Sequence, residues 1–140
     1  MKYRSLFSLA AFAALFIALP QTASATPDVG KPAPSFTGTD SRGKAISLDG
    51  YKGKTVVLEW TNHDCPYVRK HYSADNMQTL QREAAKDGIV WLQVISSAPG
   101  LEGHVAGPEA EALNRKRKAA PPGTVLDPDG KIGRLYAARH

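Results

Sequence analysis

Cysteine is almost absent from this chain, since its 140 residues contain only Cys65. One cysteine cannot form an internal disulfide, so packing alone must stabilise the folded chain. An unpaired cysteine in an exported protein indicates a reactive thiol or a bridge to another molecule, and a buried, inert cysteine is the structural alternative. The sequence also has no Gly-rich nucleotide-binding loop, so we expect no organic cofactor.

Long apolar runs are scarce too, and the one near the N-terminus is short. Leu6–Leu19 falls below the ~20 residues that a membrane span needs, follows two basic residues and precedes the small-residue cleavage site Ala23–Ala25. This layout predicts a signal peptide over residues 1–25 and one domain over residues 26–140, with no stable membrane span after cleavage. We expect a periplasmic or secreted protein, and an uncleaved anchor is the alternative.

Acidic residues are outnumbered, because 18 Lys and Arg against 13 Asp and Glu give a formal net charge of +5. Four consecutive basic residues, Arg115–Lys118, supply much of this charge. They fit either a phosphate-binding patch or the solvated end of a helix, where cations suit the negative pole. We favour the helix end, because no aromatic residues are interleaved, and we expect no nucleic-acid partner.

Strand-like and helix-like segments alternate along the rest of the chain. Strands are predicted in a hairpin within residues 35–48, in buried runs at 55–60 and 89–95, and at 124–126. Helices are predicted over residues 66–87, 108–118 and 132–137. The helical spacing slips near residues 73–76, which predicts a kink or restart, and Gly88 is the expected C-cap. This alternation is typical of an α/β fold with a mainly parallel sheet.

Cys65 lies where a thiol is easily activated. It follows a β-branched apolar run and a short polar loop, and Pro66 comes next at the expected first position of a helix. A thiol at a helix N-terminus faces unpaired N–H groups and the positive end of the helix dipole, and both favour the thiolate. The sequence therefore predicts that Cys65 is a nucleophile.

Four motifs, in this order, resemble the redoxin group of thioredoxin-fold proteins, which includes the alkyl hydroperoxide reductase and thiol-specific antioxidant family. They are the opening Gly30–Phe36, the strand Lys54–Trp60, the C-x-x-C position Cys65–Val68 and the turn Leu126–Lys131. The resemblance covers most of residues 28–138. It implies a thioredoxin-like α/β/α sandwich with an N-terminal β-hairpin.

The sequence departs from that group in three ways. Val68 stands where the second redox cysteine would be, so no cysteine of the chain can resolve a mixed disulfide on Cys65. Leu58 and Asn62 replace the Pro and the Thr or Ser of the peroxidatic pocket. The resemblance also implies a cis-proline loop, a C-terminal hairpin and a last helix, which do not appear before His140. We therefore expect an incomplete and marginally stable domain.

Several residues near Cys65 have candidate roles. Glu59 matches the buried acid that relays protons in thioredoxins, and a glutamate on an edge strand or facing solvent is the alternative. Arg69 would stabilise a thiolate by its charge, or lie on the surface. Tyr67 is expected to border the thiol, together with Pro66 and Val68.

Two histidines flank the same cysteine. His63 and His71 could join Cys65 in a copper or zinc site, since thiolate and imidazole suit both metals. We favour a loop residue and a solvated helix residue instead, because a third ligand would have to come from elsewhere. No metal is therefore expected.

Together these features predict an exported thiol-redox protein. Cys65 would attack a disulfide or a peroxide, and an external thiol would regenerate it. The expected partner is a thiol or disulfide redox partner, or a peroxide substrate. The alternatives are a catalytically weak module that binds a metal or a partner, and a non-functional fragment.

Overall fold

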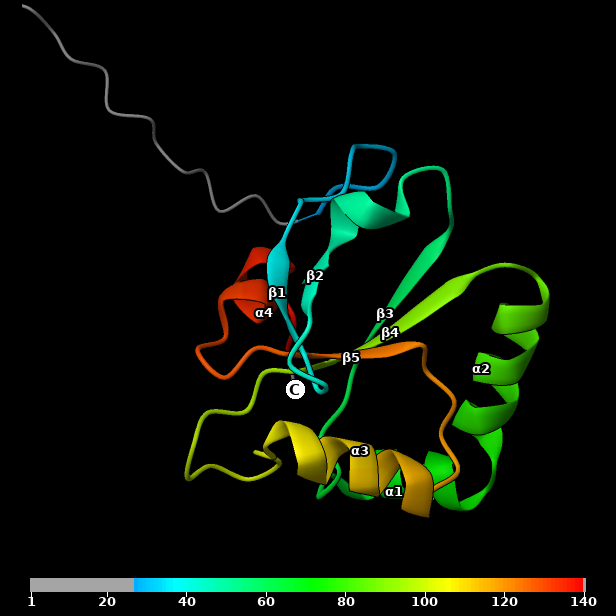
Figure 1. The fold of residues 1–140 in the computed structure, drawn as a ribbon, viewed down its shortest axis with the longest axis vertical. Helices are drawn as coiled ribbons and strands as arrows, with labels where there is room; N and C mark the ends of the chain where they lie inside the picture. The colour runs from blue at the N-terminus through cyan, green and yellow to red at the C-terminus, as the bar shows by residue number, and fades with distance from the viewer. Residues whose placement is uncertain (1–26, 140) are drawn as a thin grey trace, which may run out of the picture.

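A computed structural model describes residues 27–139, and the predicted signal peptide lies outside the described residues. Five strands form one sheet in the order β2-β1-β5-β4-β3 (Figure 1). They are β1 (Thr37–Asp40), β2 (Ala45–Ser47), β3 (Val56–Trp60), β4 (Val90–Ile95) and β5 (Gly123–Leu126). The three strands β3, β4 and β5 are parallel, whereas β1 and β2 form the antiparallel hairpin predicted at residues 35–48.

Four α-helices and one 3₁₀ turn complete the fold. They are η1 (Leu48–Tyr51), α1 (Pro66–Ser73), α2 (Asn76–Lys86), α3 (Gly107–Lys116) and α4 (Lys131–Leu135). In the view of Figure 1, α4 lies beside β1 and β2, and α2 lies on the opposite side beside β4. The elements and their order agree with the sequence pattern, with small shifts at the helix ends.

The predicted break in the long helix is confirmed. The first helix ends at Ser73 and the second begins at Asn76, with Asp75 between them in the left-handed region at φ 57°. Gly88 follows α2 at φ +72°, which is the conformation that favours glycine after a helix end. The break turns the chain between the helix that carries Cys65 and the longer helix that returns along the sheet.

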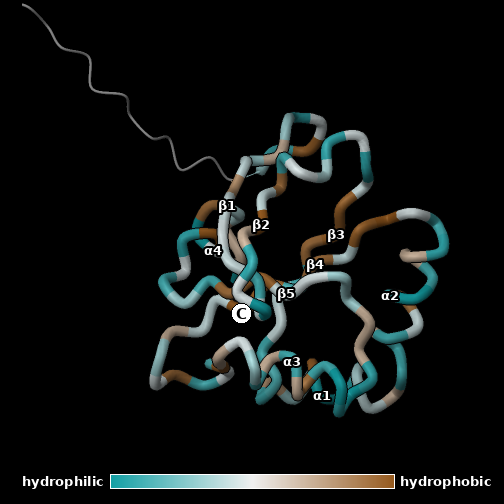
Figure 2. The backbone as a smooth tube through the Cα atoms, viewed as in Figure 1, coloured by the Kyte–Doolittle hydropathy of each residue, from teal (hydrophilic) through white to brown (hydrophobic). Residues whose placement is uncertain are grey.

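One face of the sheet carries the larger of two apolar clusters. Trp60, Val94 and Val125 are register partners on adjacent parallel strands, so their side chains share this face. Val94 and Val125 are fully buried and pack with Phe36 and with Ile132 of α4. Figure 2 shows the most hydrophobic stretches of the chain in β3 and β4, at the centre of the molecule.

The prediction that β3 is a buried strand is wrong. All five of its residues are half-buried, whereas Leu92–Ile95 of β4 are buried. The reason is topological, because β3 is an edge strand and none of residues 27–139 forms a strand on its outer side. The backbone of Thr55 and Thr61 bonds to β4, so by alternation the N–H and C=O groups of Val56, Leu58 and Trp60 point outward.

No helix among the described residues is both long enough and apolar enough to span a membrane.

The hairpin turn is held by a buried carboxylate. Asp40 Oδ1 accepts the backbone N–H of Arg42 at 2.9 Å and of Lys44 at 2.8 Å, and its Oδ2 accepts from the Arg42 guanidinium at 3.1 Å. Arg42 also donates to the carbonyl of Pro122 at 2.9 Å, which joins the turn to the start of β5. Burial opposes ionisation of Asp40, but these N–H donors and the Arg42 charge outweigh it and lower its pKa.

We predict that Asp40→Asn lowers the free energy of unfolding by about 1–3 kcal/mol at neutral pH, because a charge-assisted set of hydrogen bonds is lost. A carboxyl with a lowered pKa stabilises the fold above its ordinary pKa of about 3.9, and this contribution disappears as the pH falls. Urea unfolding should therefore show a difference between variant and native chain that shrinks from about pH 4 downward. Asp87→Asn, at an exposed position, is the control. A difference that is independent of pH would contradict this role of Asp40.

Candidate active site around Cys65

Cys65 is the N-cap residue of α1, and Pro66 occupies the first helical position, as the sequence predicts. The thiol is half-buried and free, and its side chain makes no capping hydrogen bond. The carbonyl of Cys65 accepts the N–H of Arg69 at 3.0 Å, which closes the first turn of the helix. The N–H groups of Tyr67 and Val68 have no intrahelical acceptor, so they are available to a negative charge on the sulfur.

Asn62 shapes the loop that carries the thiol. Its backbone carbonyl accepts the N–H of Cys65 at 3.2 Å, and its side-chain Oδ1 accepts the N–H of Asp64 at 2.9 Å. These two bonds fold residues 62–65 into a tight turn between the end of β3 and the start of α1. The turn fixes where Cys65 leaves the sheet.

A second loop, residues 96–106, packs against this turn. Asp64 Oδ2 accepts the N–H of Gly103 at 3.2 Å. A Cβ atom at position 103 would overlap the side chain of Asn62, and Gly103 has a φ of +79°, so both contact and conformation require glycine there. The sequence analysis missed this contact, because nothing in the sequence pairs Gly103 with Asn62.

The other predicted site residues differ in how far their side chains are exposed. Val68 is half-buried, and Arg69 is exposed on α1. Tyr67 is 75% exposed, and the expectation that its ring borders the thiol stays a prediction. His63 Nε2 lies 3.5 Å from Asp64 Oδ2, whereas His71 is exposed on α1 and its Nδ1 lies 3.2 Å from the side-chain nitrogen of Asn76.

Glu59 lies on the edge strand β3, as its alternative interpretation allowed, but its carboxylate is bonded within the fold rather than left in solvent. Its carboxylate accepts hydrogen bonds from the Tyr72 hydroxyl at 2.8 Å, Gln81 Nε2 at 3.2 Å and Trp91 Nε1 at 2.7 Å. The three donors come from α1, α2 and β4, so Glu59 joins both helices to the sheet. Its role as a proton relay for Cys65 stays a prediction.

The bonds of Glu59 belong to a buried polar row on the face of the sheet that α1 and α2 cover. Glu59, Gln93 and Thr124 are register partners on the three parallel strands. Gln93 is fully buried, donates to the Tyr72 hydroxyl at 2.6 Å and accepts from Thr124 Oγ1 at 3.1 Å. Because Gln93 interrupts a predicted apolar strand as Glu59 does, the sequence carried a signal for this row.

Tyr72 is the centre of this network. Burial and the nearby charge of Glu59 raise the pKa of its hydroxyl well above the ordinary value, so the group stays protonated and donates to the carboxylate. The guanidinium of Arg117 lies 3.9 Å from the centre of the Tyr72 ring, and burial lowers the pKa of Arg117. One of the four basic residues that we expected at a solvated helix end is therefore half-buried against the Tyr72 ring.

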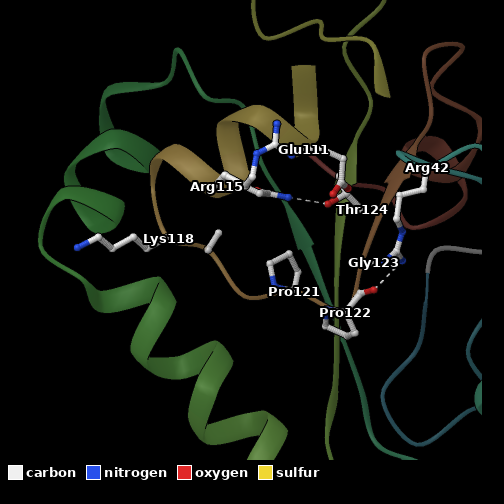
Figure 3. A pocket seen from close by; sticks show the side chains of 10 residues that line it. Arg42, Glu111, Arg115, Lys118, Pro121, Pro122, Gly123 and Thr124 are labelled. Atoms are coloured by element: carbon white, nitrogen blue, oxygen red, sulfur yellow. Dashed lines mark hydrogen bonds between the residues drawn. The ribbon is translucent and has the colours of Figure 1, made fainter. Parts of the chain in front are cut away.

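Two other residues of the basic cluster, Arg115 and Lys118, border a polar cleft of about 210 Å³ between α3, the hairpin turn and the start of β5. Figure 3 shows that its cations do not converge on one point, because Lys118 extends away from Arg42. The Arg42 guanidinium is already bound to Pro122 and Asp40. The phosphate-binding interpretation of residues 115–118 gains no geometric support from this arrangement.

Within residues 27–139, no three or more His, Cys, Asp and Glu side chains are grouped so that they could hold a metal ion.

Comparison with known proteins decides the family. Residues 29–140 match the family model described as AhpC/TSA. The chain belongs to the AhpC/TSA family. No curated protein matches this AhpC/TSA chain significantly.

Solved structures confirm the thioredoxin-like α/β fold. The thioredoxin domain of a thiol-disulfide oxidoreductase from Bacteroides vulgatus is 23% identical, with a TM-score of 0.57, and the match covers 79% of this chain and 74% of that one. An exposed lipoprotein thioredoxin from Streptococcus pneumoniae is 27% identical, with a TM-score of 0.53 and coverage of 76% and 75%. A protein from Bacteroides thetaiotaomicron is 22% identical, with a TM-score of 0.59 and 78% of this chain covered. This chain spans 64% of the length of that last protein.

We predict that Tyr72→Phe lowers the free energy of unfolding by about 1–3 kcal/mol. The substitution removes one hydroxyl that serves Glu59, Gln81 and Gln93, and it leaves buried polar groups unpaired. Tyr67→Phe removes the same atom from an exposed ring two residues after Cys65, so urea unfolding should show almost no change for it. Equal effects of the two substitutions would contradict the central role of the Tyr72 hydroxyl.

Proposed function

We propose that this chain is an exported thiol-redox protein that carries out thiol–disulfide exchange with Cys65 as its nucleophile. The main support is the position of Cys65 at the N-terminus of α1 in a thioredoxin-like fold of the AhpC/TSA family. Relatives of this fold include proteins named as thiol-disulfide oxidoreductases. The proposed partner is therefore a disulfide or thiol of another molecule.

The proposed reaction has two steps. The Cys65 thiolate attacks one sulfur of a substrate disulfide, whose S–S bond breaks, and the other sulfur leaves as a thiolate. An external thiolate then attacks the substrate sulfur of this mixed disulfide and releases Cys65 as a thiolate. We expect Arg69, one helical turn after Cys65, to stabilise the thiolate by its charge.

Disulfide exchange is better supported than peroxide reduction. The peroxidatic positions hold Leu58 and Asn62 in place of Pro and Thr or Ser. Leu58 packs against the apolar core, and the Asn62 carbonyl and side chain both bond within the Cys65 turn. Asn62 therefore lacks the hydroxyl of the Thr or Ser that the family's peroxidatic pocket has at this position, and Leu58 does not supply one.

Export is supported by the basic, apolar and small-residue segments of residues 1–25. It also agrees with the S. pneumoniae relative, which is described as an exposed lipoprotein.

The one-cysteine mechanism makes a direct prediction for Val68→Cys. After reaction with glutathione disulfide, the native chain should keep one glutathione on Cys65 until a thiol is added. In the variant, the new thiolate should attack the Cys65 sulfur, release glutathione as a thiolate and leave an internal disulfide. Intact-mass measurement distinguishes the two products.

Ser73→Cys is the matched control, because it adds a cysteine to the same helix two turns away from Cys65. It should keep the glutathione adduct on Cys65. Loss of the adduct from the native chain without added thiol would contradict the proposed mechanism.

A further inference from the structure

A cleft of about 420 Å³ opens beside the turn that carries Cys65. One wall is formed by His63, and the other by α3 and the loop before it. Its lining includes His63, His104, Val105, Glu109, Leu113 and Lys116. Its volume falls within the range of ligand-binding pockets, about 300–1,000 Å³.

The cleft lies within reach of a group bound to the Cys65 sulfur. His63 is two residues from Cys65, so their Cα atoms are at most about 7 Å apart. The two walls are joined at the turn itself, because Asp64 Oδ2 accepts the N–H of Gly103, next to His104. A molecule that forms a disulfide with Cys65 can therefore extend directly into the cleft.

The base of the cleft is apolar. Val105 is buried and packs with Ile95 and Ala110, and Leu113 of α3 is half-buried against the same cluster. Two exposed apolar side chains also lie close to the turn along the chain. Tyr67 is 75% exposed two residues after Cys65, and Leu101 is 65% exposed two residues before Gly103. Apolar side chains of a bound molecule would be covered by this base.

Two charged residues, Glu109 and Lys116, lie at the rim of the cleft, and they differ in the contacts they already make. Glu109 Oε2 accepts the N–H of Ala106 at 2.9 Å at the start of α3, so its carboxylate is already engaged. Lys116 lies two helical turns further on, is exposed, and takes part in none of the ion pairs among the described residues. Glu109 keeps its negative charge at the start of α3, and Lys116 makes the other end of the rim positive.

We propose that this cleft binds a segment of the disulfide-bearing substrate polypeptide, one that carries a large apolar residue and an acidic residue beside its cysteine. This proposal rests on the proposed thiol–disulfide exchange by Cys65, and it adds that the disulfide belongs to a polypeptide. The apolar residue packs over Leu113 and Val105, and the carboxylate pairs with Lys116. The cleft then holds the substrate disulfide near Cys65 during the attack.

The test uses the full chain and two peptides that each contain one cysteine, coupled to thionitrobenzoate through a disulfide. The peptides are identical except that the cysteine is flanked by Leu and Glu in one and by Leu and Lys in the other. Attack of the Cys65 thiolate on the peptide sulfur releases coloured thionitrobenzoate, which gives a second-order rate constant. We expect the acidic peptide to react about threefold faster, as one exposed ion pair allows.

Lys116→Glu should reverse this preference, because it replaces the rim cation with an anion. Lys86→Glu is the matched control, since it makes the same charge change at the exposed end of α2 and should leave the preference unchanged. Alkylation of Cys65 by iodoacetamide should be equal in all three proteins, because the cleft is not needed for a small reagent.

An equal ratio of the two rate constants in the native chain and in Lys116→Glu would overturn the cleft proposal, and so would an equal shift in Lys86→Glu. If Cys65 reacts with iodoacetamide but with neither peptide disulfide, the proposed exchange reaction itself fails.

Discussion

The buried hydroxyl of Tyr72 forms hydrogen bonds that connect α1, the helix after Cys65, to α2 and to strands β3 and β4. Tyr72 lies on the last turns of the helix that begins at Cys65, and its hydroxyl bonds to Glu59 of β3 and Gln93 of β4. Gln81 of α2 donates to the same oxygen. A buried polar network of this kind is stable only when each group has a partner, so it fixes one position of α1 against the sheet. That position is what presents the thiol at the end of β3.

The sequence predicted the order and type of the elements well, because hydrophobic period and turn residues are local signals. The break near residues 73–76 and the glycine at 88 are examples, and both appear as expected. The burial of β3 was predicted wrongly, since an apolar run does not reveal which strand lies at the edge of a sheet. The contact between Asn62 and Gly103 could not be predicted either, because only the tertiary fold brings these two residues together.

The candidate site was only partly accessible from the sequence. Cys65 and Pro66 could be placed at a helix start because proline marks the first helical position. The partners of Glu59 could not be named, since they come from three separate elements. In the proposed reaction, Cys65 begins the disulfide exchange and an external thiol is needed to complete it. The surface around the thiol, where the second molecule would bind, is therefore as important for the proposed reaction as the thiol itself.

The proposed function requires that the fold activates Cys65. The most direct test compares the rate of reaction with iodoacetamide for the folded chain and for the chain unfolded in urea, at one pH. Glutathione, measured in both solutions, corrects for the effect of urea on the reaction. The folded chain should react faster, because the start of α1 stabilises the thiolate only when the helix is formed. An equal or slower rate in the folded chain would contradict this activation.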